Sequence, residues 1–92
     1  MALKITQQRE TFLVEGTINA MTALNFQSHL KFALKTCDEL VINIENVVEI
    51  DTNGMNAMRY IYNESVALDK KIYIVGTGCK EVYDDLYYNN VA

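Results

Sequence analysis

Residues 40–62, LVINIENVVEIDTNGMNAMRYIY, decide the fold that this sequence predicts. The stretch opens with an apolar run rich in β-branched side chains, which indicates a buried strand over residues 40–44. A short loop follows, and from Met55 onward the apolar residues recur at the spacing of one helical face. The polar residues 51–54 stand between the strand and the helix. We therefore expect the hydroxyl of Thr52 at the point where a strand gives way to a helix, a place suited to binding or regulation.

Length and composition limit the class of protein. Ninety-two residues predict a single domain spanning residues 1–92, and a chain that is 50% hydrophobic without proline is expected to fold compactly. The formal charge of −4 and the eight Lys and Arg residues, which form no cluster, argue against nucleic-acid binding. A protein partner is the expectation that remains.

The chain offers no sequence signal for a metal site, a cofactor or a membrane anchor. Cys37 and Cys79 lack the spacing of metal ligands, and His29 alone cannot complete a site with them, so both thiols are expected to be reduced and structural. No apolar run approaches the roughly 20 residues that span a bilayer, and the N-terminus does not resemble a signal peptide. We expect a cytoplasmic protein without membrane insertion.

The flanking segments supply the rest of an α/β fold. Residues 3–7 and 12–14 predict a β-hairpin whose second strand ends at Gly16. A helix follows, capped by Asn19 or Thr22, with an apolar stripe at i, i+4, i+7, i+8 and i+11. Further along the chain, a strand over residues 72–75 and a helix over about 79–88 complete the order β-β-α-β-α-β-α. This order predicts a mixed four-stranded sheet with helices packed mainly on one face and the hairpin at an edge.

Polar residues and glycines gather where the parallel strands of this sheet are expected to end. Functional groups of open α/β sheets lie outside the carboxyl ends of the strands. We therefore define the strand-end rim as the candidate functional surface, with every glycine of the chain placed at such an end. Its polar members are Asn19, Asp51, Thr52, Asn53 and Thr77.

Three stretches resemble the STAS domain, and within it the bacterial anti-sigma factor antagonists of partner switching. Residues 12–19, FLVEGTIN, are similar to the family's strand and Gly-x-Leu-Asp turn. Residues 41–45 with 50–55, IDTNGM, resemble the central strand and the Asp-Ser-(Ser/Thr)-Gly-Leu signature, and residues 72–76 match the next strand. The chain ends at Ala92, about where the family's last strand and closing helix would begin, so it resembles a short form.

The resemblance implies a non-enzymatic protein-binding switch. In the family, a serine/threonine kinase that is also the anti-sigma factor phosphorylates the first hydroxyl residue after the Asp, which is Thr52 here. Phosphorylation would add about −1.5 to −2 charge and block partner binding without refolding the domain. The resemblance departs at Asn53, which replaces a second hydroxyl residue, and at Asn19, which replaces a common Asp. The partner-binding residues that it implies are Asn19, Asp51, Asn53, Gly54 and Met55.

Other interpretations stay open at this point. Thr52 could serve only as the N-cap of the helix. A constitutive subunit that docks on a transporter ATPase or a larger signalling assembly, and a small-ligand binder at the rim, are the alternatives to an antagonist. The Gly76 to Lys80 loop lacks the spacing of a phosphate-binding loop. The sequence also shows no catalytic nucleophile accompanied by a general base. The aromatic cluster near the C-terminus fits either the edge of the core or, if exposed, a homo-oligomer or partner surface: Tyr83, Tyr87 and Tyr88.

Overall fold

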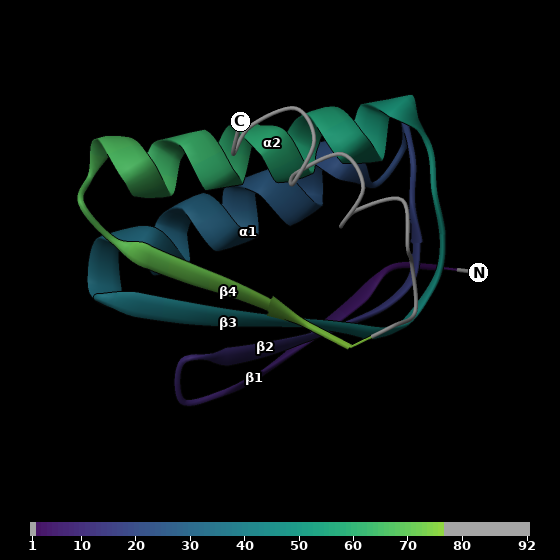
Figure 1. Cartoon of the computed structure of the whole chain (residues 1–92). Coiled ribbons are helices and arrows are strands. Elements are labelled where there is room, and N and C mark those ends of the chain that lie inside the picture. The colour runs from purple at the N-terminus through teal and green to yellow at the C-terminus, as the bar shows by residue number, and fades with distance from the viewer. Residues whose placement is uncertain (1, 77–92) are drawn as a thin grey trace.

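The computed structural model describes residues 2–76, which form a four-stranded sheet and two helices (Figure 1). This confirms the predicted order β-β-α-β-α-β. The helix predicted over residues 79–88 and the tyrosines near the C-terminus lie outside the described residues. In chain order the elements are β1 (Lys4–Gln8), β2 (Thr11–Ile18), α1 (Ala23–Thr36), β3 (Glu39–Ile50), α2 (Thr52–Ala67) and β4 (Lys71–Val75).

The sheet has the strand order β1-β2-β3-β4, with β1 antiparallel to β2 and the other two pairs parallel. Each parallel pair is joined through a helix, and Figure 1 shows α1 and α2 side by side on the same face of the sheet. The hairpin therefore lies at one edge, as the sequence predicts. This topology brings the carboxyl ends of β2 and β3 and the beginnings of α1 and α2 to the same end of the domain.

The core lies between the helical layer and the sheet, and its helical contributors are those that the periodicity predicts. Phe26, Leu30 and Leu34 of α1 are fully buried, as are Met58 and Ile61 of α2. Burying an aliphatic or aromatic side chain of this size contributes about 1.5–3 kcal/mol to folding. The strands supply the facing layer of buried side chains: Phe12, Val14 and Ile18 from β2, and Leu40, Ile42, Ile44 and Val47 from β3.

The loop that we predicted after residue 44 does not exist, because β3 continues without interruption to Ile50. The pairing of β2 with β3 shifts register twice, so β3 carries extra residues and the alternation of inward and outward side chains breaks. Asn43 supports the first irregularity, since its Oδ1 accepts a hydrogen bond from the N–H of Glu45 at 2.9 Å. When a strand loses its alternation of apolar and polar residues within a polar segment, its sequence pattern is the same as that of a loop.

The prediction that Gly16 ends β2 is also wrong. Gly16 lies inside the strand, is buried, and adopts a φ of 94°, next to the second register shift. A Cβ at this position would collide with the backbone carbonyl of Ala2, because the N-terminal segment passes directly over it. Glycine is therefore required here by a bulge and a close backbone approach, which lets β2 extend to Ile18.

Candidate functional site at the strand-end rim

The rim residues of β2 and β3 are joined directly by the backbone. The N–H of Asp51 donates a hydrogen bond to the carbonyl of Ile18 at 3.1 Å, just where each strand ends. The turn that contains Asn19 and the start of α2 therefore lie side by side at this end of the sheet. The structure thus brings together the two segments that the sequence assigned to the partner-binding surface.

Asp51, rather than Thr52, caps α2. The Asp51 Oδ1 accepts a hydrogen bond from the N–H of Gly54 at 3.0 Å, and the Asp51 carbonyl accepts one from the N–H of Met55 at 2.8 Å. Asp51 has extended backbone angles, as an N-cap residue does. The alternative that Thr52 serves as the N-cap is therefore excluded by the geometry.

Thr52 is the first residue of α2 and is exposed. Its hydroxyl forms no hydrogen bond to any of residues 2–76. Asn53, the next residue, is exposed as well, and so is the capping Asp51. Three consecutive polar side chains at the beginning of a helix thus face solvent. Among residues 2–76, only the Asp51 carboxylate of these three is seen to stabilise the fold, as the helix cap.

Gly54 lies beneath this surface. A Cβ at Gly54 would come within 2.5 Å of the Ile18 carbonyl oxygen and 2.6 Å of the Ile50 Cγ1. The absence of a side chain therefore lets the first turn of α2 rest directly on the ends of β2 and β3. Met55 is half-buried and packs against the core, which leaves part of its side chain at the surface. Gly54 is buried, so it fixes the position of the exposed turn without presenting a side chain to the surface.

The Asn19 turn is held by a small network of hydrogen bonds. The Asn19 Oδ1 accepts from the N–H of Met21 at 2.9 Å, and the Asn19 N–H donates to the Thr22 hydroxyl at 2.9 Å. The Thr22 hydroxyl in turn donates to the carbonyl of Thr17 at 2.8 Å. The amide of Asn19 thus fixes the turn through its oxygen.

This network corrects the capping prediction for α1. Thr22 occupies the N-cap position, but its side chain makes no capping hydrogen bond to the helix. The backbone carbonyl of Asn19 accepts the bond from the N–H of Ala23 at 2.7 Å instead. Residue types favoured at caps are also favoured in turns. The sequence therefore predicted the N-cap position of Thr22 but could not predict which backbone groups its hydroxyl would bond.

The charges next to Thr52 are negative. Glu49 and Asp51 are both exposed at the end of β3. The first cation of α2 is Arg59, about two helical turns beyond Thr52, and its guanidinium donates to the Asn56 side chain. A phosphate on Thr52 would therefore find no lysine or arginine within the first turn of α2.

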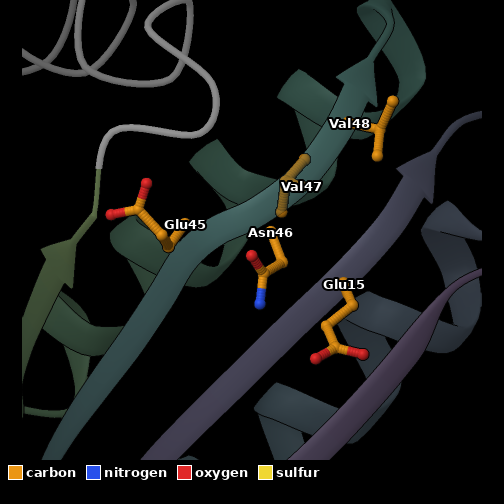
Figure 2. Close-up of a pocket in the computed structure, with 5 residues that line it drawn as sticks. All are labelled: Glu15, Glu45, Asn46, Val47 and Val48. Carbon is orange, nitrogen blue, oxygen red and sulfur yellow. The ribbon is translucent and has the colours of Figure 1, made fainter.

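A hollow near the rim is lined by Glu15, Glu45, Asn46, Val47 and Val48 (Figure 2). It lies along the irregular part of β3, with Glu15 contributed by the neighbouring β2.

Among residues 2–76 there is no group of three His, Cys, Asp or Glu side chains that could hold a metal ion. Cys37 is a free, half-buried thiol at the end of α1.

The model of the STAS domain family matches residues 2–84. The chain belongs to the STAS domain family. STAS domains are typically regulatory and non-catalytic. No curated protein sequence matches the chain. Within residues 2–76, neither helix of this STAS domain combines the length and apolar character needed to cross a membrane.

Solved structures similar to this STAS domain include two forms of one protein and a mycobacterial relative. The phosphorylated form of the Bacillus cell fate determinant SpoIIAA has a TM-score of 0.72 at 13% identity, over 96% of this chain and 84% of that chain. The unphosphorylated anti-sigma factor antagonist SpoIIAA has a TM-score of 0.63 at 13% identity, over 95% of this chain and 99% of that chain. An anti-sigma factor antagonist from Mycobacterium paratuberculosis has a TM-score of 0.69 at 14% identity, over 98% of this chain and 78% of that chain. At these identities the likeness shows a SpoIIAA-like fold.

Proposed function

We propose that this STAS domain is an anti-sigma factor antagonist whose binding to a kinase that is also its anti-sigma factor is switched by phosphorylation of Thr52. The observation that carries the proposal is the state of Thr52, which is exposed and whose hydroxyl makes no hydrogen bond to residues 2–76. Since Asp51 caps the helix, a kinase that modifies Thr52 does not compete with the fold for the hydroxyl. The similar SpoIIAA has been solved in a phosphorylated form, which fits the same chemistry.

The physical effect of the phosphate follows from its place on α2. It would add about −1.5 to −2 charge at the first residue of the helix, where the helix dipole favours an anion. The fold is therefore expected to survive. At the surface, however, the phosphate joins the carboxylates of Asp51 and Glu49, and a partner that binds the dephosphorylated rim meets both a bulky group and repulsion. Blocking of the interface, rather than refolding, would release the partner.

A constitutive docking subunit is the second candidate, and Asn19 favours it. The side chain of Asn19 holds its turn through its oxygen and presents a neutral amide, whereas antagonists commonly carry an Asp at the corresponding position. A subunit of a transporter ATPase or a larger signalling assembly would need the rim as a contact surface without any modification of Thr52.

The two functions separate in a binding experiment with three forms of the chain. Tagged wild type, Thr52→Glu and the control Asn63→Asp are used to retain partners from extract of the native cell, and the partners are identified by mass spectrometry. The proposal predicts that a kinase-type ATPase binds wild type and the control but not Thr52→Glu. Because the control adds a negative charge at an exposed residue of α2 outside the strand-end rim, it shows whether the place of the charge matters. Equal retention of one partner by all three forms would favour the constitutive subunit.

A further inference from the structure

The three most exposed large apolar side chains of residues 2–76 gather at one helix. Met21 is 88% exposed, Leu24 70% and Phe32 68%. Leu24 and Phe32 are separated by eight residues of α1, so both lie on the helix face that points away from the core, and Met21 immediately precedes the helix. Single exposed apolar residues are ordinary, whereas a row of them along one helix face is typical of an interaction surface.

The shape of this face suits a second helix. Ser28 lies between Leu24 and Phe32 on the same stripe, and its small side chain leaves an open hollow lined by Asn25, Ser28, His29 and Phe32. The hollow lies beside Phe32, on the side of α1 that carries Asn25 and His29, and a protruding side chain of a partner helix can enter it. The stripe from Leu24 to Phe32 runs along about 12 Å of α1, which corresponds to between two and three turns of a partner helix.

The charge of the face identifies the chemistry of the partner. α1 contains Lys31 and Lys35 and no Asp or Glu, although the chain as a whole carries −4. Lys31 is exposed, and hydrogen bonding to Tyr60 of α2 raises the pKa of its ammonium. Lys35 is exposed and forms no ion pair with any of residues 2–76. Both lysines lie on the same side of α1 as Leu24, and the Nζ of Lys31 leans toward α2, where it lies 5.5 Å from the centre of the Tyr60 ring.

This charge distribution decides between three kinds of occupant. In a pair of α1 helices from two copies, four lysines would face one another without an acidic residue from either helix. An anionic lipid surface would meet only two lysines on a domain whose net charge repels it. An apolar helix face flanked by carboxylates satisfies both the stripe and the lysines.

We propose that the outer face of α1 is the docking surface for an acidic amphipathic helix of a partner protein. The proposal does not depend on Thr52, because the surface lies on a different helix and its tests leave the strand-end rim unchanged.

The test uses two synthetic helical peptides and the full chain. Both peptides carry leucine at i, i+4 and i+7; the first has glutamate at the flanking positions and the second has lysine. Fluorescence anisotropy with labelled peptide is expected to show saturable binding of the acidic peptide. The double variant Leu24→Ser/Phe32→Ser should weaken this binding at least about tenfold. Val66→Ser is the matched control, since Val66 is 64% exposed on α2, and it should bind as wild type does.

Reversal of charge supplies the second readout. The variant Lys31→Glu/Lys35→Glu should lose the acidic peptide and gain the lysine peptide. Equal binding of the two peptides to wild type, or no saturable binding of the acidic one, would overturn the proposal. So would a wild-type dimer in sedimentation velocity that Phe32→Ser dissociates, or co-sedimentation with phosphatidylglycerol vesicles that the double serine variant loses. Circular dichroism of each variant verifies folding, which is expected because all five substituted side chains are exposed.

Discussion

The assignment of the α2 cap to Asp51 rather than Thr52 makes a quantitative prediction about stability. Asp51→Ala removes the acceptor of the Gly54 N–H, and loss of such a cap costs about 1 kcal/mol. It also removes a negative charge from the N-terminus of the helix, which contributes about 0.3–1 kcal/mol. We therefore expect Asp51→Ala to lower the free energy of unfolding by about 1–2 kcal/mol. In a domain of this size, each kcal/mol lowers Tm by about 4–8 °C.

Thr52→Ala should leave stability unchanged or raise it by a few tenths of a kcal/mol, because the hydroxyl makes no bond to residues 2–76 and alanine has the higher helix propensity. The assay is thermal and urea unfolding followed by far-UV circular dichroism. Asp51→Ser is the matched control: serine keeps a capping oxygen without the charge, so it should recover about 1 kcal/mol of the loss caused by alanine and keep only the part that comes from the charge. If Thr52→Ala destabilised the domain as much as Asp51→Ala does, Thr52 would be a structural residue and the reasoning about a free hydroxyl would fail.

Three further substitutions test the packing and hydrogen bonds of the rim. Gly54→Ala should cost about 1–3 kcal/mol through overpacking against the Ile18 carbonyl, despite a gain of about 1 kcal/mol in helix propensity; an unchanged urea midpoint would contradict the close packing. Thr22→Val removes the hydroxyl that bonds two backbone groups and should cost about 1–3 kcal/mol, whereas Thr22→Ser should be nearly neutral in the same assay. Asn19→Asp keeps an acceptor for the Met21 N–H and should change stability by less than about 0.5 kcal/mol, and under the antagonist proposal it should tighten kinase binding, measured by calorimetry.

The sequence predicted the types, order and pairing of the described elements because their apolar periods are strong. The stripe through Phe26, Leu30 and Leu34 identified the buried face of α1, and all three residues are fully buried. The change from strand spacing to helical spacing located the start of α2 within a few residues. Parallel pairing of β2, β3 and β4 then followed from the intervening helices.

The errors arose where local geometry departs from a regular period. The register shifts of β3 interrupt its alternation, so Glu45 and Asn46 resembled a loop. Gly16 was taken for a strand end, because the sequence does not show that the N-terminal segment crosses over it. A glycine in a strand fits either a bulge or an end, and only tertiary contacts distinguish the two.

The sequence predicted where the polar residues of the rim lie, but not which of them cap a helix and which are exposed without a structural role. Asp and Thr are both favoured N-cap residues, so the order Asp51-Thr52 does not reveal which one caps the helix. In the same way, Gly54 was assigned to the partner surface, and its close packing on Ile18 is visible only once the two strand ends are paired. The exposed stripe of α1 was not predicted, because the apolar period of that helix identifies only its buried face. Leu24 and Phe32, at i and i+8 on the opposite face, were the available signal.

The phosphorylation state of Thr52 in the native cell tests the central proposal most directly. Trypsin is expected to release residues 36–59 as one peptide, in which Thr36 and Thr52 are the only hydroxyl-bearing residues. Intact-mass measurement followed by fragmentation of this peptide therefore assigns a phosphate without ambiguity. The proposal predicts one phosphate on Thr52 in at least one of growth, starvation and stress. An unmodified Thr52 in all three conditions would contradict the switch and leave the constitutive docking subunit as the function of the domain.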